Sequence, residues 1–243
     1  ALGLLSRLPV PPGDAARGAA AAWAFPLAGL ILGALAALLG VIAHAFGSPS
    51  PLTALIVLGF LTMATGAIHE DGLADTADGF WGGWTREKRL RIMRDSTVGT
   101  YGVIALVLSL LLRWYLIAEL ITDGALIWSL VIAAAGSRAA MVWVMDSLPP
   151  ARRDGLSERS GRPGELATGV AVLFAVCLTV LAPDVSAWRL VLLAFLAALM
   201  VRQVAKRKIG GQTGDVLGAT QQVTEIALLA GCQMMAYGWQ AIP

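Results

Sequence analysis

Charged residues are scarce in this chain of 243 residues, because Asp, Glu, Lys and Arg together make up only 14% of it. Soluble domains carry about 25% charged residues and need them to cover their surface. Here 57% of the residues are hydrophobic, and the mean hydropathy is +0.73. The composition therefore argues against a soluble domain and predicts a protein covered largely by lipid.

Cysteine and concentrated positive charge are also lacking. Cys177 and Cys232 stand alone within apolar runs, which argues against a disulfide framework or a zinc site. The formal net charge of +2 is too small for a nucleic-acid-binding domain, so we expect no nucleic-acid partner. The chain begins without Met and is expected to be trimmed, and its first apolar stretch, broken at Pro9, is too short for a secretory signal.

Seven apolar stretches match a transmembrane helix, which needs about 20 residues to cross the hydrocarbon core. They cover residues 19–45, 52–68, 101–121, 125–145, 166–182, 188–205 and 216–239. The sequence therefore predicts an all-α, polytopic integral membrane protein with about seven transmembrane helices, forming one domain over residues 1–243.

The distribution of Lys and Arg predicts a cytoplasmic N-terminus. With that orientation, 15 of the 18 basic residues fall in segments on the inside, as the positive-inside rule requires. The outside connections are short turns, whereas the inside connections are longer and polar. We therefore expect cytoplasmic active-site loops near residues 69–99, 146–165 and 202–218.

An acidic segment follows the second apolar stretch and begins at His69. Asp71, Asp75 and Asp78 are spaced i, i+4 and i+7, which places them on one face of a helix. Like charges at this spacing repel each other unless a cation neutralises them. Oxygen ligands without cysteine favour Mg²⁺, Mn²⁺ or Ca²⁺, and Mg²⁺ completes its shell with water and phosphate oxygens. The segment thus predicts metal-dependent phosphate chemistry, with a solvated acidic loop as the alternative.

A basic segment over residues 86–94 comes next and returns to an acid at Asp95. Its Arg and Lys side chains either mark the cytoplasmic side or hold phosphate oxygens that the metal does not reach. We expect Asp95 to be a further metal or substrate ligand, with Arg94 and Ser96 beside it in substrate binding.

A glycine cluster at residues 210–219 opens the last apolar stretch. Gly211, Thr213 and Gly214 allow backbone N–H groups to approach a phosphate at a helix N-terminus, and Asp215 adds a carboxylate. The alternative is a glycine turn followed by close helix packing.

Polar side chains continue into the last apolar stretch and include Glu225. Unpaired polar groups are costly inside a membrane and indicate a cavity or a partner. Arg113 and Arg138 also fall inside predicted spans, where they either pair with Glu225 or with helix carbonyls, or contact substrate.

Three motifs in this order resemble the cobalamin synthase family, the adenosylcobinamide-GDP ribazoletransferases. They are His69-x-Asp-Gly-Leu-Ala-Asp-Thr-Ala-Asp-Gly79, Ile92-Met-Arg-Asp-Ser-x-x-Gly99 and Gly210-Gly-x-Thr-Gly-Asp-x-Leu-Gly-Ala219. The opening Ser6-Arg-Leu-Pro-Val-Pro11 is also similar to the family's N-terminus, so the likeness covers nearly the whole chain. Glu70 is a departure, because an apolar residue is expected there.

The resemblance implies a multi-pass enzyme of the bacterial or archaeal cytoplasmic (inner) membrane that completes the nucleotide loop of cobalamin. It would join adenosylcobinamide-GDP to α-ribazole, or to its 5′-phosphate, and release GMP with Mg²⁺ as cofactor. The acidic and glycine motifs would hold the catalytic, metal and substrate sites. The sequence leaves open whether the protein is a homo-oligomer.

In the mechanism we expect, Asp71, Asp75, Asp78 and Asp95 hold Mg²⁺ against the diphosphate. The ribazole 3′-hydroxyl attacks phosphorus, and a carboxylate or His69 takes its proton. Substrate contacts are expected from Arg94, Ser96, Gly211, Thr213, Gly214, Asp215 and Glu225.

Two alternatives are kept. The run Asp75-Thr-Ala-Asp78-Gly79 is similar to the start of the CDP-alcohol phosphotransferase signature, whose later paired aspartates are absent. A cation transporter also places acids beside spans, although there they are expected nearer the midplane.

Overall fold

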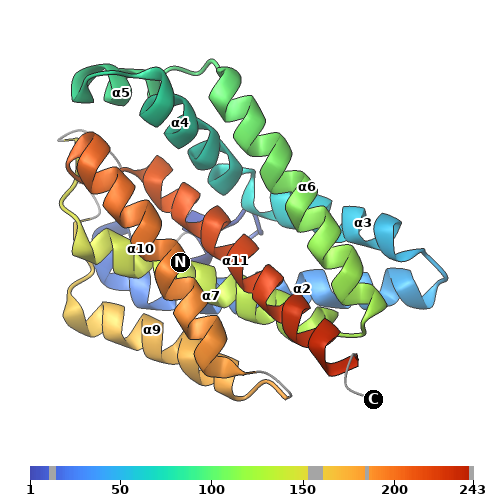
Figure 1. Ribbon diagram of the computed structural model, residues 1–243. Helices are drawn as coiled ribbons and strands as arrows, with labels where there is room; N and C mark the ends of the chain where they lie inside the picture. The colour runs from blue at the N-terminus through green and yellow to red at the C-terminus, as the bar shows by residue number, and fades with distance from the viewer. Residues whose placement is uncertain (11–14, 153–160, 184–185, 241–243) are drawn as a thin grey trace.

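The computed structural model describes residues 1–10, 15–152, 161–183 and 186–240 of the chain (Figure 1). The helices of this part are α1 (Leu2–Leu5), η1 (Ala15–Ala24), α2 (Phe25–Ala45), α3 (Ser50–Thr65), α4 (Ile68–Gly82), α5 (Arg86–Ile92), α6 (Thr100–Thr122), α7 (Leu126–Ser147), α9 (Glu165–Val180), α10 (Ala187–Ile209) and α11 (Gly214–Gln240). Each of the seven predicted apolar stretches corresponds to a helix, which confirms the all-α prediction. Pro11, at the end of the opening motif, and residues 153–160 of the predicted 146–165 loop lie outside the described residues.

Four helical segments of the described chain are long and apolar enough to cross a membrane, namely Ala19–Ala45, α6, α7 and α10. The pair α3 and α4 passes the same test together, but the two helices are bent by 85°. α9 is apolar but has only 16 residues. The protein is therefore a polytopic membrane protein, while the count of seven spans and the cytoplasmic N-terminus stay predictions.

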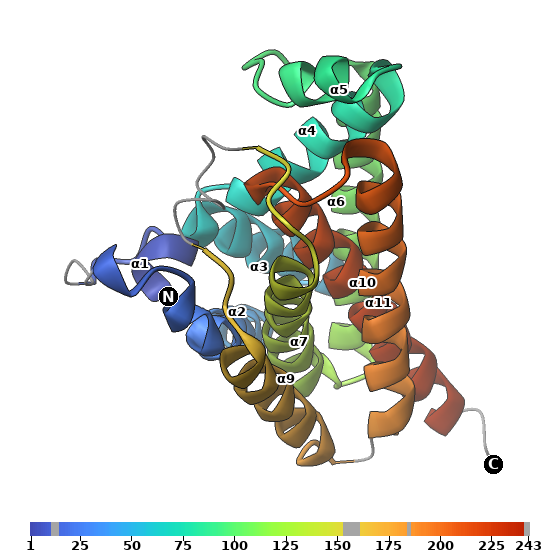
Figure 2. The same cartoon turned by 90° about the vertical axis from the view of Figure 1, so that its left-hand side faces the viewer.

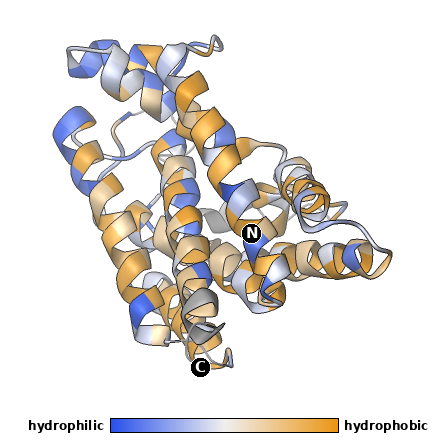
Figure 3. Cartoon of the chain, turned by 45° about the vertical axis from the view of Figure 1, so that its right-hand side comes forward, coloured by the Kyte–Doolittle hydropathy of each residue, from blue (hydrophilic) through white to orange (hydrophobic). Residues whose placement is uncertain are grey.

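The outer faces of the long helices are apolar, as lipid contact requires. On α6, large residues such as Ile104, Leu108 and Leu111 are about half exposed, and α10 presents Leu192 and Phe195 in the same way. In Figure 3, hydrophobic residues follow these helices, whereas hydrophilic residues gather on α5 and on the neighbouring end of α10. The polar end of the molecule is thus the end that carries α5.

α7 is the central helix of the bundle. Within its apolar window 78% of the residues are buried by the rest of the protein, against 17% for α10. α7 packs against α2, α11 and α9, and Figure 2 shows α9 and α10 beside it with α4 and α5 above. Its only strongly polar large side chain in this buried part, Arg138, therefore lies inside the protein.

A sharp bend separates α3 from α4. Gly66 ends α3 with φ = 65°, and Ala67 follows with φ = 56°, the only non-glycine positive φ among the described residues. The amide of Ala67 bonds back to the carbonyl of Thr62 at 2.8 Å, which closes the last turn of α3. α3 is apolar, whereas α4 carries four acidic residues and turns away from α3 by 85°.

Candidate active site

α4 crosses the start of α11 at a pair of glycines. A Cβ atom added at Gly72 would lie 2.8 Å from the carbonyl oxygen of Asp215 and 3.2 Å from Cα of Gly218. Side chains at this crossing would push the helices apart, so the two glycines allow the backbones to approach. The crossing brings the acidic face of α4 next to Asp215 at the beginning of α11.

The acidic residues of α4 run from solvent into the protein. Asp71 is exposed, Asp75 is half-buried and Asp78 is buried. Burial, followed by the charges of Asp71, Asp215 and Asp78, raises the pKa of Asp75 to about 7. We call Asp71, Asp75, Asp78 and Asp215 the carboxylate cluster.

Asp215 is held in place by its neighbours. Its Oδ2 atom lies 3.3 Å from a guanidinium nitrogen of Arg152 and accepts a hydrogen bond from the Thr213 hydroxyl at 3.1 Å. Burial raises the pKa of the Asp215 carboxyl, and Arg152 opposes this effect. Thr213 also accepts from the amide of Val216 at 3.3 Å, so it caps α11 and fixes Asp215 in the first turn.

Asp78 joins α4 to the start of α6. Its two carboxylate oxygens accept the backbone amides of Gly99 and Gly102 at 2.7 and 2.9 Å. A Cβ atom at either glycine would overlap this carboxylate, so the glycines make room for it. The bonds satisfy amides at the N-terminus of α6, where negative charge is favourable.

Asp95 lies apart from the cluster, in the loop between α5 and α6. It is exposed, and its Oδ1 accepts from the Thr97 amide at 3.1 Å and from the Thr97 hydroxyl at 2.8 Å. These bonds lower the pKa of Asp95. Arg94 and Ser96, its neighbours, are also exposed. The ligand role of Asp95 stays a prediction.

The glycine cluster forms a turn that pairs with the segment after α7. Gln212 donates to the carbonyl of Pro149 at 2.9 Å and accepts from the amide of Ala151 at 2.8 Å. A Cβ atom at Gly211 would overlap the Pro149 carbonyl. Gly211 therefore serves this backbone contact, while Gly214 is exposed at the start of α11.

Three basic residues donate hydrogen bonds to backbone carbonyls at the polar end of the molecule. Arg86 donates to the carbonyls of Ile209 at 2.8 Å and Ala151 at 2.7 Å, and Arg89 donates to that of Lys208 at 3.0 Å. Lys208 in turn donates to the carbonyl of Phe80 at 2.9 Å. These contacts dock α5 onto the end of α10, a role that neither interpretation of the basic segment included, and both interpretations stay predictions.

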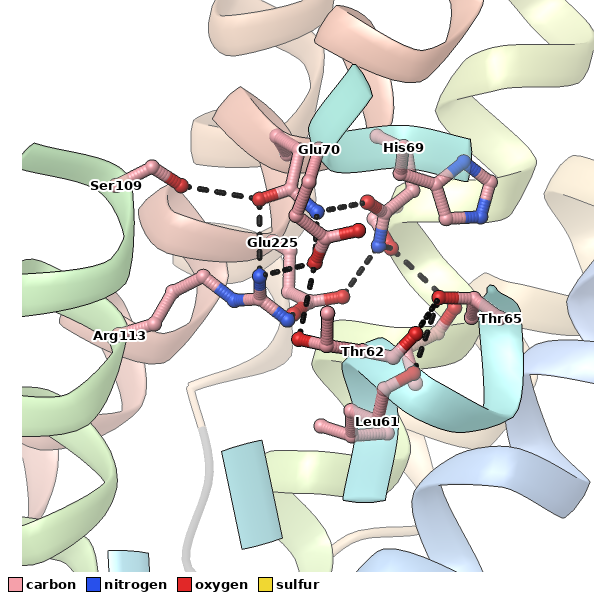
Figure 4. A network of polar contacts seen from close by, with 12 residues as sticks. Leu61, Thr62, Thr65, His69, Glu70, Ser109, Arg113 and Glu225 are labelled. Atoms are coloured by element: carbon pink, nitrogen blue, oxygen red, sulfur yellow. Dashed lines mark hydrogen bonds and ion pairs between the residues drawn. The ribbon is translucent and has the colours of Figure 1, made fainter. Parts of the chain in front are cut away.

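A buried ionic network joins α4, α6 and α11 (Figure 4). Arg113 of α6 contacts Glu70 of α4 at 2.7 Å and Glu225 of α11 at 2.9 Å, and all three side chains are less than 10% exposed. Gln222 accepts from Arg113 at 3.0 Å and donates to Glu70 at 3.2 Å. Glu70, Arg113, Gln222 and Glu225 form what we call the ionic network.

The structure gives partners to the charged residues in the predicted spans. Arg113 pairs with Glu225, as one alternative held, and Glu70 is its second partner. Arg138 donates to the carbonyl of Ala134 at 2.9 Å, and its other terminal nitrogen lies 3.5 Å from Nε2 of His69. Glu225 is thus engaged inside the protein, and no contact joins it to the carboxylate cluster among the described side chains.

The donor set of the cluster fits a hard cation such as Mg²⁺. In the described part of the chain, no three His, Cys, Asp or Glu side chains converge closely enough to enclose an ion by themselves. Mg²⁺ commonly takes only one or two protein carboxylates and completes its shell with water and phosphate. Burial and then the neighbouring carboxylates raise the pKa of Asp75, and a cation would neutralise the charge of those carboxylates.

Comparison with known proteins identifies the family of this chain. The family described as cobalamin-5-phosphate synthase matches residues 1–233. The chain belongs to this family. A relative from Sinorhizobium medicae is 46% identical, covering 93% of this chain and 91% of its own length, and one from Azorhizobium caulinodans is 45% identical, covering 97% and 94%. Both are named adenosylcobinamide-GDP ribazoletransferase, as is a relative from Bradyrhizobium diazoefficiens at 46% identity. No solved structure matches the chain.

Membership of the cobalamin-5-phosphate synthase family confirms the resemblance seen in the three motifs, and the relatives' shared name makes the chain a transferase. The sequence did not lead us to two features of the site. Arg152, which pairs with Asp215, is one of several basic residues, and nothing in the sequence distinguishes it from the others. The hydrogen bonds that Asp78 accepts from the amides of Gly99 and Gly102 could have been anticipated, because both positions are glycines.

Proposed function

We propose that this chain transfers the phosphocobinamide group of adenosylcobinamide-GDP to α-ribazole, or to its 5′-phosphate, with release of GMP. The product is adenosylcobalamin or its phosphate. The observation that carries the proposal is the carboxylate cluster at the α4–α11 crossing, in a chain whose relatives bear the ribazoletransferase name. We place the reaction on the cytoplasmic side of a bacterial inner membrane, where the predicted topology puts the polar connections.

In this reaction Asp71, Asp75 and Asp215 are the residues that would hold Mg²⁺. The bound cation neutralises charge on the diphosphate and on the departing GMP. Asp78 joins α4 to the start of α6 and so fixes the position of the acidic face of α4. Arg152 orients Asp215 and adds positive charge beside the phosphate site.

The bond changes follow from the two substrates. The 3′-hydroxyl oxygen of ribazole attacks the phosphorus attached to cobinamide, and the bond from that phosphorus to the GMP oxygen breaks. A carboxylate oxygen of the cluster accepts the hydroxyl proton. The raised pKa of Asp75 makes it a better proton acceptor than an ordinary aspartate.

The two alternatives are not favoured. A CDP-alcohol phosphotransferase would belong to a different family from the one that matches residues 1–233. A cation transporter would need acids along a path through the bundle, whereas the buried acids Glu70 and Glu225 are both paired with Arg113.

The test is reconstitution in liposomes with adenosylcobinamide-GDP, α-ribazole and Mg²⁺, with and without EDTA. We expect GMP and cobalamin to appear together by chromatography and to disappear with EDTA. Folded protein that gives no GMP and no cobalamin would refute the transferase assignment. Product formation in the presence of EDTA would refute the requirement for a metal but not the transferase assignment.

A further inference from the structure

A cavity of about 400 Å³ lies between the N-terminal segment and the bend that joins α3 to α4. This volume falls within the range of small-molecule binding pockets. Its wall carries two charged side chains, those of Arg7 and Asp71, together with the polar residues Ser6 and Thr65. Because Asp71 belongs to the carboxylate cluster, the cavity adjoins the site proposed for the reaction.

The position of Arg7 is set by the end of α3. Its amide donates to the carbonyl of Ala64 at 2.7 Å, and its side chain lies along Gly66. A Cβ atom at Gly66 would be 2.6 Å from Nε of Arg7, so the glycine makes room for this side chain. The bend between α3 and α4 therefore holds Arg7 at the wall of the cavity.

The guanidinium of Arg7 has no partner among the described residues. Arg7 and Asp71 line the same cavity, yet no ion pair joins them and no described oxygen accepts a hydrogen bond from the Arg7 side chain. Arg152, in contrast, contacts Asp215 at 3.3 Å. The N–H donors of Arg7 are therefore free for a ligand that enters the cavity.

We propose that this cavity binds a phosphate group of the substrates, with the guanidinium of Arg7 donating to the phosphate oxygens. This inference rests on the proposed function and adds a substrate-binding residue to its site. A positive and a negative side chain that face one cavity without pairing suit a phosphate together with Mg²⁺. Asp71 would hold the cation on one side, and Arg7 would neutralise the phosphate oxygens on the other.

Both substrates of the proposed reaction can offer such oxygens. Adenosylcobinamide-GDP carries a diphosphate and α-ribazole 5′-phosphate carries a terminal phosphate, whereas α-ribazole itself carries none. An arginine side chain stays protonated and binds phosphate oxygens through two parallel N–H bonds. Arg7 therefore contributes to substrate binding and not to proton transfer, and its loss should appear in the affinity.

The experiment measures the three substrates separately with full-length protein in lipid nanodiscs. KM and kcat are determined for adenosylcobinamide-GDP, α-ribazole and α-ribazole 5′-phosphate, and the binding of each is measured by calorimetry. Arg7→Met removes the charge but keeps the backbone bond to Ala64. Losing hydrogen bonds from a charged group should raise Kd and KM of the substrate bound by Arg7 about ten- to a hundredfold.

Two further variants serve as references. Arg7→Lys retains the charge but loses the planar pair of donors, so we expect a smaller rise than in Arg7→Met. Arg189→Met, at an exposed position near the start of α10, is the matched control and should behave as wild type. The thermal unfolding midpoint of Arg7→Met should match that of wild type, because the Arg7 side chain is exposed and bonds to no described residue.

The substrate that loses affinity identifies the source of the phosphate. A rise confined to α-ribazole 5′-phosphate assigns the cavity to the phosphate of the acceptor. A rise for adenosylcobinamide-GDP, with either acceptor, assigns it to the diphosphate. Wild-type protein gives an independent answer, since phenylglyoxal modifies arginine. We expect it to label Arg7, and the substrate so identified should protect Arg7 in peptide mass spectra.

Three results would overturn the proposal. They are unchanged Kd and KM of all three substrates in Arg7→Met, labelling of Arg7 that no substrate slows, and an equal rise for α-ribazole and its 5′-phosphate alone. Wild-type protein that forms cobalamin, with an Arg7→Met variant that forms it at the same KM values, refutes this inference alone. Wild-type protein that forms no cobalamin and binds none of the substrates refutes the proposed function.

Discussion

Glu70 and Asp71 are neighbours in sequence but belong to two regions with opposite electrostatics. Successive residues of a helix point about 100° apart, so Glu70 faces the interior with 6% exposure while Asp71 faces solvent. In the ionic network the negative charges of Glu70 and Glu225 meet Arg113 directly, with Arg138 nearby. In the carboxylate cluster four acids share one Arg152.

This difference in charge indicates which of the two regions binds a cation from solution. Together with the neighbouring Arg138, the ionic network balances its charge, and it holds α4, α6 and α11 together. The carboxylate cluster stays in excess of negative charge. Together with burial, which is the larger cause, this charge raises the pKa of Asp75, and it favours a cation from solution. A paired buried charge thus serves the fold, whereas the unbalanced charge serves the reaction.

Removing the central charge of the ionic network should have the largest effect. Arg113→Met leaves Glu70 and Glu225 buried without their partner, and breaking such a pair costs about 3–5 kcal/mol. We expect a corresponding loss in the free energy of unfolding, measured in detergent by thermal or denaturant unfolding. Arg91→Met, at an exposed position of α5, is the control and should unfold as wild type. Equal stability of the two variants would contradict the role given to the ionic network.

Removing one charge from the carboxylate cluster should instead spare the fold and reduce activity. For Asp75→Asn we expect kcat to fall roughly 10²- to 10³-fold, the size typical of losing one electrostatic contact to the transition state. Stability should be unchanged or higher, since like charges are relieved. The control is Glu87→Gln on exposed α5. If Asp75→Asn kept wild-type kcat and Mg²⁺ dependence, Asp75 would have no place in the site.

The affinity for Mg²⁺ should depend on pH near neutrality. The pKa of Asp75 is raised to about 7, so its proton is bound below that pH and competes with the cation. We expect the apparent affinity to fall about tenfold per pH unit below 7 and to level off above it. Titrating Mg²⁺ at several pH values between about 6 and 8 measures this. Asp75→Asn should remove the dependence, and a flat profile in wild-type protein would contradict it.

Weakening the link between α4 and α6 should have the smallest effect. Asp78→Asn replaces one of the two oxygens that accept the Gly99 and Gly102 amides, which costs about 1 kcal/mol for one hydrogen bond. We expect a lower unfolding midpoint and a weaker Mg²⁺ affinity as α4 shifts. The exposed variant Asp95→Asn should lower the midpoint less. A larger loss from Asp95→Asn would reverse the assignment of these two acids.

The helices and the acidic face could be predicted because both depend on local patterns. Apolar length predicted α6 and α7 to within two residues, and the i, i+4, i+7 spacing predicted the shared face of Asp71, Asp75 and Asp78. Spacing says nothing about exposure along the axis of the helix. The descent from exposed Asp71 to buried Asp78 therefore required the structure.

Contacts between distant segments were beyond the sequence. Glu70 and Arg113 are 43 residues apart, and any buried acid could have been the partner of Arg113. The bend at Gly66 and Ala67 was hidden because alanine rarely adopts a positive φ. The crossing of Gly72 and Gly218 depends on that bend. The sequence therefore indicated Asp215 as a substrate contact but could not place it beside α4.

Arg86, Arg89 and Lys208 hold the polar end together by binding carbonyl oxygens, and every amino acid carries a carbonyl. The contacts to the accepting residues, such as Ala151 and Ile209, therefore depend on the position of the backbone and not on the identity of the side chain. Substitutions at the receiving positions can accumulate without loosening the docking, provided that the turn keeps its course. The donor side chains cannot be replaced in this way, because the hydrogen bonds require Arg or Lys. At this end of the molecule, the acceptor positions should therefore tolerate substitution, whereas the donor positions should not.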